Sequence, residues 1–309
     1  LPRHDPGKTI KVISWRGHSD TEVMLAAFER WGVAEALSRF NGMFAFALWD
    51  KEQRMLHLAR DRMGEKPLYY GWMGDTFLFG SELKGLKAHP AWRSEIDRSA
   101  LALFMRHNYV PSPYSIYRGI NKLLPGHWLS ISFAHGLREL PQSRPYWSAR
   151  EVVEAGVRQP FAGDEAEAIE SLDALLRDAV ALRMEADVPL GAFLSGGYDS
   201  STVVSLMQAQ SRRPVKTFSI GFHEKGYNEA VYAKEVARHL GTEHTELYVS
   251  AEEAMAVIPR LPAIYDEPFS DSSQIPTFLV SKMTRGFVTV ALSGDGGDEL
   301  FGGYTRYSW

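Results

Sequence analysis

The feature that most limits the folds open to this chain is an apolar run that ends in a glycine-rich turn and continues into a helical pattern. The run spans residues 188–194, the turn is Ser195-Gly196-Gly197, and the helical pattern begins at Asp199. This order predicts a β-strand followed by a helix whose first amides lack partners within the helix. Free amides and the positive end of the helix dipole attract anions, so the turn predicts a phosphate-binding loop.

The residue types in and after this turn fit such a loop. Gly196 and Gly197 let the backbone approach a phosphate closely, while Ser195 and Ser200 add hydroxyl donors. An acid beside a phosphate repels it unless a cation lies between them, so Asp199 predicts bound Mg²⁺. For the motif alone, a tight turn with a serine-rich helix cap is the alternative. No lysine follows Gly197, which excludes a Walker A loop, and the glycine spacing excludes a dinucleotide loop.

A second segment repeats this order near the end of the chain. An apolar run at residues 287–292 is followed at residues 293–303 by Ser-Gly-Asp-Gly-Gly-Asp-Glu-Leu-Phe-Gly-Gly. Taken alone, this segment also fits a flexible surface loop. The carboxyl ends of strands in an open α/β sheet line one crevice, where ligands bind. We therefore expect both loops at one site, with Asp199 and Asp298 as ligands of the same Mg²⁺.

The pattern of apolar segments divides the chain into two parts. Short strands separated by glycine or charged turns indicate a β-rich layer in the first part, with strands expected at residues 44–48, 55–58, 67–70 and 76–79, and helices at 21–31 and 99–106. The second part alternates helices (165–184, 199–210, 228–240) with strands (188–194, 215–221, 244–249, 287–292). Such alternation predicts a parallel sheet covered on both faces, and hence an α/β fold class.

Composition limits the compartment and the partners. The 309 residues are 45% hydrophobic, which is enough for two ordinary cores. A net charge of −4 gives no reason to expect nucleic acid or a membrane surface as a partner. The sequence has no cysteine, which excludes disulfides and thiolate metal sites. No apolar stretch approaches membrane-spanning length and the first residues do not form a signal peptide, so we expect a cytoplasmic enzyme.

Several long motifs resemble the glutamine-hydrolysing asparagine synthetase family. Residues 195–201 resemble the pyrophosphate loop of the ATP-pyrophosphatase superfamily, and residues 265–273 and 293–304 narrow the match to this family. Further motifs resemble its glutaminase domain, at residues 17–23, 41–50, 59–70, 79–84 and 124–127. The resemblance implies an antiparallel α/β/β/α sandwich of the N-terminal-nucleophile amidotransferase type, followed by a parallel-sheet α/β ATP-pyrophosphatase domain.

The resemblance also implies the extent of each domain. We expect the glutamine amidotransferase domain at residues 1–147, a linker at 148–164 and the synthetase domain at 165–309. Family glutaminases use an N-terminal cysteine, an arginine and an Asn-Gly-Glu segment, and the synthetase site uses a lysine beyond the second loop. None of these is recognised in the sequence, so we expect both domains to be incomplete and the chain to be a fragment. A natural pseudo-amidotransferase is the alternative.

The family motifs imply roles for individual residues. Asp20 matches the acid that binds the α-ammonium group of glutamine, and it also fits an N-cap of a helix beginning at Thr21. Asp295 matches an acidic position that is linked with formation of the acyl-adenylate. The implied ATP-binding residues are Phe193, Leu194, Ser195, Gly196, Gly197, Asp199, Ser200, Ile220, Ser293 and Gly294, and the implied metal ligands are Asp199 and Asp298. Within this set, the backbone near Phe193, Leu194 and Ile220 corresponds to positions that hold adenosine.

The function implied by the resemblance is ATP-dependent amidation of aspartate through β-aspartyl-AMP, with ammonia from glutamine hydrolysis. ATP and Mg²⁺ are the implied cofactors. Glutamine, aspartate and ATP are the implied small-molecule substrates, and a homodimer is compatible with the family. Two alternatives stay open: a nucleotide-binding chain without catalysis, and a relative that closes a β-lactam ring or amidates another carboxylate.

Other polar residues fit structural roles better than chemical ones. Arg60, Asp61, Arg62 and Lys66 form a charged cluster between two expected strands, which is usually a structural network. We also expect His127 and His244 to be structural.

Overall fold

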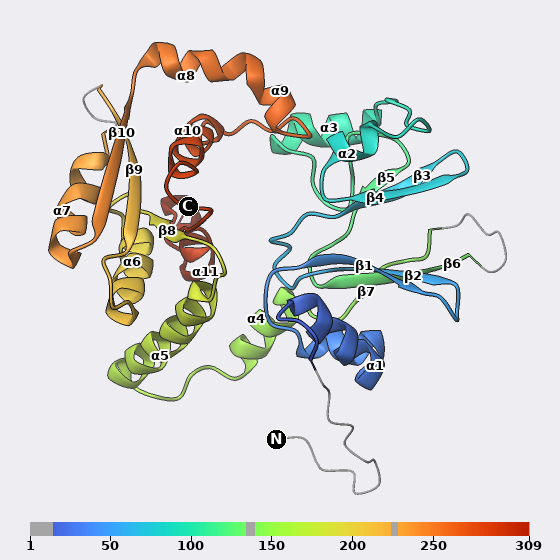
Figure 1. Ribbon diagram of the computed structural model, residues 1–309, viewed down its shortest axis with the longest axis horizontal. Helices are drawn as coiled ribbons and strands as arrows, with labels where there is room; N and C mark the ends of the chain where they lie inside the picture. Colours follow the sequence, from blue (N-terminus) through green and yellow to red (C-terminus); the bar gives the residue numbers. More distant parts are fainter. Residues whose placement is uncertain (1–14, 134–139, 224–227, 309) are drawn as a thin grey trace, which may run out of the picture. The chain divides into compact units, whose positions relative to one another are not determined.

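The chain folds as two compact units, Leu1–Gln159 and Pro160–Trp309 (Figure 1). The computed structural model describes residues 15–133, 140–223 and 228–308. The boundary between the units falls inside the expected linker, most of which forms helix α4, Ala149–Arg158. None of the described helices combines the length and the apolar character needed to cross a membrane.

The first unit contains two antiparallel sheets. One has the strand order β1-β2-β6-β7, formed by Ala45–Asp50, Met55–Arg60, His127–Ser132 and Arg144–Pro145. The other has the order β4-β3-β5, formed by Thr76–Gly80, Tyr69–Met73 and Ile120–Lys122. The strands expected at residues 44–48, 55–58, 67–70 and 76–79 correspond to β1, β2, β3 and β4, whereas β5, β6 and β7 were not predicted.

Apolar side chains pack on both faces of the second sheet. Leu58 and Leu129 of the first sheet share a buried cluster with Tyr70 of the second. The neighbouring Tyr69 belongs instead to a cluster with Leu83 and Ala100, because successive strand side chains point to opposite faces. Leu83 lies in α2 (Leu83–Lys87) and Ala100 in α3 (Arg98–His107), so these two helices cover the outer face of this sheet.

Helix α1, Asp20–Arg39, covers the outer face of the first sheet. The ring centroid of Phe28 lies 5.2 Å from that of Phe46 in β1. The helix expected at residues 21–31 is therefore longer than predicted, and it bends at Gly32, whose φ of 74° and ψ of 169° are not helical. The layers of the unit are helix, sheet, sheet and helix, which confirms the predicted sandwich.

The second unit contains a parallel sheet with the strand order β10-β9-β8-β11. Its strands are β8 (Leu190–Phe193), β9 (Lys216–Phe222), β10 (Glu243–Val249) and β11 (Val290–Leu292). Every pair in it is parallel, which confirms the predicted sheet type. Ala192 pairs with Leu292, so β8 and β11 end side by side although about a hundred residues separate them in the sequence.

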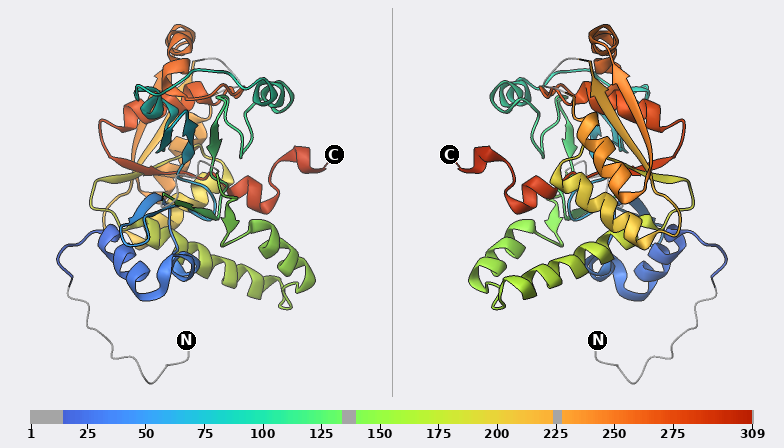
Figure 2. Two further views of the ribbon diagram at one scale, coloured as in Figure 1. Left: turned by 90° about the vertical axis from the view of Figure 1, so that its right-hand side faces the viewer. Right: turned by 90° about the vertical axis from the view of Figure 1, so that its left-hand side faces the viewer.

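Helices cover both faces of this sheet (Figures 1 and 2). Helices α5 (Glu165–Met184), α6 (Tyr198–Gln210) and α7 (Ala230–Leu240) share one buried cluster with Ala192 and Leu194. Helix α10 (Gln274–Thr284) lies on the other face, where Val280 packs with Phe218. The remaining helices are α8 (Ala251–Val257), α9 (Leu261–Ile264) and α11 (Gly297–Phe301), with short 3₁₀ turns at Ile258–Arg260 and Thr305–Ser308.

The last strand is shorter than predicted. Of the apolar run at residues 287–292, only Val290–Leu292 forms a strand. The backbone amides of Phe287 and Val288 donate instead to the carbonyl of Thr284 at the end of α10. These residues satisfy the last turn of a helix, which an apolar pattern alone does not distinguish from a strand.

Candidate functional site

The first loop, residues 194–197, connects β8 to α6 in a conformation that requires glycine. Gly196 has a φ of 84°, in the left-handed region. A Cβ atom at this position would lie 2.7 Å from Cβ of Tyr232 and 2.8 Å from the amide nitrogen of Ala233. The loop therefore packs closely against α7, and any side chain at Gly196 would collide with that helix.

Ser200 holds the first loop from inside α6. Its hydroxyl accepts a hydrogen bond from the amide of Ser195 at 3.2 Å and lies 2.9 Å from the Ser195 hydroxyl. Ser200 is 8% exposed, so water competes little for these contacts. No side chain caps the N-terminus of α6, which begins after Gly197. The first turn of this helix therefore presents free amides and a partial positive charge.

The second loop, residues 293–296, connects β11 to α11. The Ser293 hydroxyl donates to a carboxylate oxygen of Asp295 at 3.0 Å. One carboxylate oxygen of Glu299 accepts from the amide of Gly296 at 3.1 Å, and the other accepts from the Tyr304 hydroxyl at 2.8 Å. Glu299 thus connects the loop to the segment that follows α11.

Two glycines of the second segment let it lie against the start of α6. A Cβ atom at Gly294 would lie 2.7 Å from the amide nitrogen of Ser200. A Cβ atom at Gly297 would lie 2.3 Å from a carboxylate oxygen of Asp199. Side chains at these positions would separate the two loops, so glycine is required for their contact.

The two loops and α10 enclose a cavity of about 300 Å³. It is lined by Phe193, Ser195, Asp199, Ser200, Thr277, Val280, Ser293, Gly294, Asp295, Asp298, Glu299 and Tyr304. Eight of the residues predicted from the sequence are among them: Phe193, Ser195, Asp199, Ser200, Ser293, Gly294, Asp295 and Asp298.

Four other predicted residues lie beside this cavity rather than in its lining. Leu194 is 1% exposed, and its amide donates to the carbonyl of Phe218 in β9. Ile220 packs with Phe193 against the cluster below α10. Gly196 and Gly197 line a separate hollow between α6 and α7. The buried Leu194 side chain is therefore not accessible to a ligand, whereas Ile220 is half-buried.

The sequence did not indicate Thr277 and Val280, which α10 contributes to the cavity. Three positions apart, they share one face of the helix. No motif marks them, and only the packing of α10 on the sheet brings them beside the loops. Glu299 and Tyr304 lie inside the motif noted at residues 293–304, where the sequence assigned them no role.

The carboxylates of Asp199 and Asp298 fit a magnesium ion that phosphate groups also bind. Both line the cavity. Among the described residues, no group of three or more His, Asp or Glu side chains could enclose a metal by itself. Mg²⁺ typically keeps several waters and binds through one or two carboxylates together with phosphate oxygens of a substrate. Two carboxylates beside a glycine loop with free helix amides match the donor set of this mode of binding.

Asp20 is not the N-cap of α1, contrary to the expectation from the sequence. The helix begins at Asp20 and its N-cap is Ser19, whose hydroxyl accepts from the amide of Thr21 at 3.1 Å. One Asp20 carboxylate oxygen also accepts from the same amide, at 2.7 Å. Glu22 accepts from the amides of Arg16 and Gly17, both at 2.8 Å, and orders the approach to the helix. The exposed Asp20 stays available to a ligand at the helix start.

The charged cluster of the first unit is a structural network, as predicted. Asp61 is 0% exposed, and its carboxylate accepts from the amides of Phe44, Glu65 and Lys66. The Arg60 guanidinium donates to three backbone carbonyls, those of Gly64, Lys66 and Leu123. Burial lowers the pKa of Arg60 below its ordinary value.

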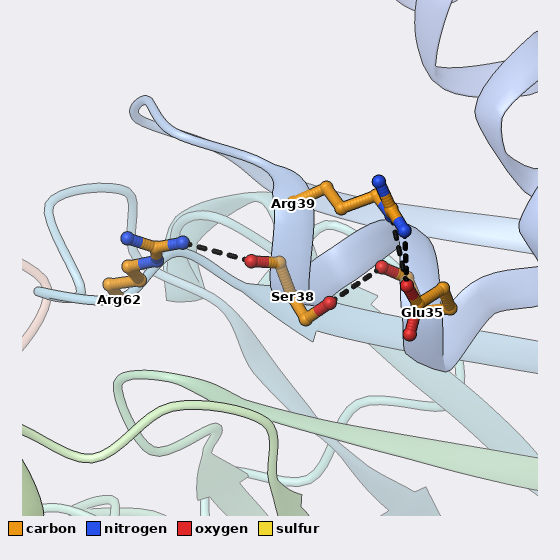
Figure 3. A network of polar contacts seen from close by, with 4 residues as sticks. All are labelled: Glu35, Ser38, Arg39 and Arg62. Carbon is orange, nitrogen blue, oxygen red and sulfur yellow. Dashed lines mark hydrogen bonds and ion pairs between the residues drawn. The ribbon is translucent and has the colours of Figure 1, made fainter. Parts of the chain in front are cut away.

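Arg62 connects the same cluster to α1 (Figure 3). Its guanidinium donates to the carbonyl of Ser38 at 3.0 Å. The Ser38 hydroxyl donates to the carbonyl of Glu35, and the Arg39 side chain forms an ion pair with Glu35 at 2.6 Å. These contacts hold the end of α1, which is a structural role.

The two histidines that the sequence placed in structural roles have protein partners. Nδ1 of His244 lies 2.9 Å from the Thr217 hydroxyl, and Nε2 lies 3.2 Å from the Ser219 hydroxyl. Burial is the main cause that lowers the pKa of His244. Nδ1 of His127 lies 2.8 Å from the carbonyl of Pro125. Neither residue lines the cavity between the loops.

Comparisons with known proteins divide the chain at a similar place. Residues 9–147 match the model of a glutamine amidotransferase domain, and residues 171–309 match the model of asparagine synthase. The chain is 38% identical to asparagine synthetase (glutamine-hydrolysing) 1 of Bacillus subtilis, over 96% of this chain and 45% of that protein. It is 41% identical to a protein of Methanocaldococcus jannaschii provisionally named asparagine synthetase (glutamine-hydrolysing) 2, over 94% of this chain and 54% of that protein. The chain thus spans about half the length of these curated relatives.

Proposed function

The chain belongs to the asparagine synthetase family, and on this premise we propose that its second unit carries the ATP-dependent amidating site of an enzyme that makes asparagine. The observation that carries the proposal is the meeting of two glycine loops in one cavity with Asp199 and Asp298. An isolated phosphate loop would fit many functions. A second loop that adds carboxylates fits a reaction in which pyrophosphate leaves ATP, because the carboxylates would hold a metal ion that neutralises its charge.

The first loop is proposed to hold the pyrophosphate of ATP. The free amides at the start of α6 and the hydroxyls of Ser195 and Ser200 supply donors to phosphate oxygens. Gly196 and Gly197 keep side chains away from the approach. Asp199 and Asp298 would hold Mg²⁺, which when bound neutralises negative charge on the pyrophosphate.

The other end of the cavity is proposed to hold the nucleoside. Phe193 and Val280 are proposed to form its apolar wall, and Ile220 packs against the same cluster as Phe193. Ser293 and Gly294 are proposed to bind near the ribose and the α-phosphate, by analogy with the family positions. The Asp295 carboxylate accepts a hydrogen bond from the Ser293 hydroxyl. It is proposed to take part in forming the acyl-adenylate from the substrate carboxylate.

The proposed reaction has two displacement steps. A carboxylate oxygen of aspartate attacks the α-phosphorus of ATP, forms an O–P bond and breaks the bond to pyrophosphate. Ammonia then attacks the acyl carbon of β-aspartyl-AMP, AMP leaves with the bonding electrons, and the new amide nitrogen loses a proton. Donors placed in advance around the phosphates would stabilise charge as it develops, which is usually the largest contribution to catalysis.

The first unit is proposed to belong to the ammonia-producing half of the enzyme, with Asp20 binding the α-ammonium group of glutamine. The 309 residues contain no cysteine, so this chain by itself holds no thiol nucleophile for glutamine hydrolysis. We therefore expect it to release no glutamate from glutamine, in an assay that includes a complete glutaminase as a positive control.

Pyrophosphate release tests the proposal directly. With MgATP, aspartate and ammonium, a complete enzyme that contains this chain should form one pyrophosphate for each asparagine, because ammonium replaces the glutaminase reaction. Omission of aspartate is the control and should abolish the release. If pyrophosphate appears only with a different carboxylic acid, the acceptor is not aspartate. Failure to release pyrophosphate with any acid, together with no binding of MgATP, would rule out the proposed site.

A further inference from the structure

Helix α10 contributes a part of the cavity lining that lies outside the two glycine loops. Thr277 and Val280 are its two lining residues, and they lie three positions apart on the same face. Val280 is buried in a cluster with Phe218 and Val288. Thr277 is exposed, and within the described part of the chain no hydrogen bond of its hydroxyl is found. The helix thus presents an apolar group and a free hydroxyl to the cavity.

The residues that line the cavity include both polar and apolar side chains. The charged end of a nucleotide fits the two loops, where the carboxylates and the uncapped start of α6 lie. The flat apolar base fits the wall of Phe193 and Val280, which pack in the same cluster. A sugar with its hydroxyls connects these two ends in any nucleotide. A neutral hydroxyl about one helical turn from Val280 suits the sugar better than either end.

We propose that the Thr277 hydroxyl hydrogen-bonds a ribose hydroxyl of the bound nucleotide and makes the site prefer ribonucleotides. This rests on the proposed function, because it assumes that the cavity binds ATP. A threonine hydroxyl both donates and accepts, and a ribose hydroxyl does the same. When the sugar lacks that hydroxyl, Thr277 is left without its partner and the preference follows.

The test compares ATP with 2′-deoxy-ATP and 3′-deoxy-ATP in binding to the protein with Mg²⁺, by titration calorimetry. One hydrogen bond contributes about 1 kcal/mol, which corresponds to roughly three- to tenfold in Kd. The unchanged protein should bind ATP more tightly than at least one deoxy analogue by this factor. Thr277→Val keeps the shape and removes the hydroxyl, so it should weaken ATP binding by the same factor and abolish the preference.

Two further variants separate the hydroxyl from the fold. Thr277→Ser keeps the hydroxyl and should keep the preference for ATP. Thr284→Val makes the same substitution two turns further along α10, at a buried residue that does not line the cavity, and should leave every Kd unchanged. The Thr284 hydroxyl is buried without a hydrogen-bond partner, so its removal should not lower stability.

The outcomes distinguish this inference from the proposed function. If the unchanged protein binds ATP and Thr277→Val retains the same preference, or loses affinity equally for all three nucleotides, the assignment of Thr277 is wrong while the nucleotide site stands. If the unchanged protein binds none of the three nucleotides, both proposals fail.

Discussion

Each unit has acidic side chains just after the end of a strand, but their surroundings differ between the two units. Asp61, just after β2, is fully buried, and three backbone amides of its own unit donate to its carboxylate. Asp199 and Asp298 follow β8 and β11 and line an open cavity, and among the described residues no donor to either side-chain carboxylate is found. A carboxylate that the fold itself satisfies stabilises structure. A carboxylate that the fold leaves unsatisfied beside a phosphate loop is available to a metal ion, and the comparison predicts different losses on substitution.

The largest effect is expected at the two carboxylates of the cavity. Asp199→Asn or Asp298→Asn should lower pyrophosphate release by about 100-fold or more, because the amide keeps the shape but does not bind Mg²⁺ well and several kcal/mol of charge stabilisation are lost. Denaturation midpoints should stay the same or rise, since one of two neighbouring negative charges is removed. Asp173→Asn, in an exposed ion pair with Arg177, is the matched control and should change neither quantity. If stability fell together with activity, these carboxylates would have a structural role like that of Asp61.

The next effect is expected at Asp61 and should appear in stability. Asp61→Asn places an amide group against backbone donors, which should lower the free energy of unfolding by about 3 kcal/mol. Seven of the eight tryptophans lie in the first unit, so tryptophan fluorescence during urea unfolding reports on this change. Asp50→Asn is the control, because exposed turn amides donate to Asp50. Equal losses from both variants would contradict a special role for the buried carboxylate.

A smaller effect is expected at Ser200, the buried residue that holds the first loop. Ser200→Ala removes the hydroxyl that accepts from the Ser195 amide. The loop should become less ordered before binding, and the Kd for MgATP should rise by roughly three- to tenfold. Ser205→Ala, on the same helix, removes a hydroxyl that donates only within the helix and should not change the Kd. Ser200→Thr, which retains the hydroxyl, should bind more tightly than Ser200→Ala, and the reverse order would argue against the contact.

The smallest effect is expected from the buried histidine of the second unit. Burial lowers the pKa of His244 below its ordinary 6.5, so the unfolded chain binds a proton more readily than the folded protein does. Stability should therefore fall as the pH drops below 6.5 and continue to fall towards the folded pKa. His244→Gln should reduce this pH dependence. An NMR titration that assigns His244 a pKa above 6.5 would reverse the sign and contradict its burial.

Much of the second unit could be predicted because its signals are local. The apolar run before Ser195 and the helical pattern after Gly197 specify a strand, a turn and a helix through nearest-neighbour preferences. Alternation of strands and helices then favours a parallel sheet, and parallel strands end at one edge. The strand expected at residues 287–292 forms only in its second half, because the amides of the first residues bond to the end of α10 instead.

Two glycine-rich segments that follow apolar runs, in an order typical of the family, can be identified from the amino-acid sequence without the structure. Backbone preferences of glycine and the free amides of a helix start act within a few residues, so local sequence is sufficient to encode them. The fold, by contrast, sets two features that no local pattern encodes: the Asp61 carboxylate accepts hydrogen bonds from backbone amides while, within the part of the chain that the structure describes, those of Asp199 and Asp298 do not, and Thr277 lines the cavity. Hydrogen-bond satisfaction and cavity walls depend on which distant segments meet. Here the pairing of β8 with β11 and the packing of α10 on the sheet bring those segments together.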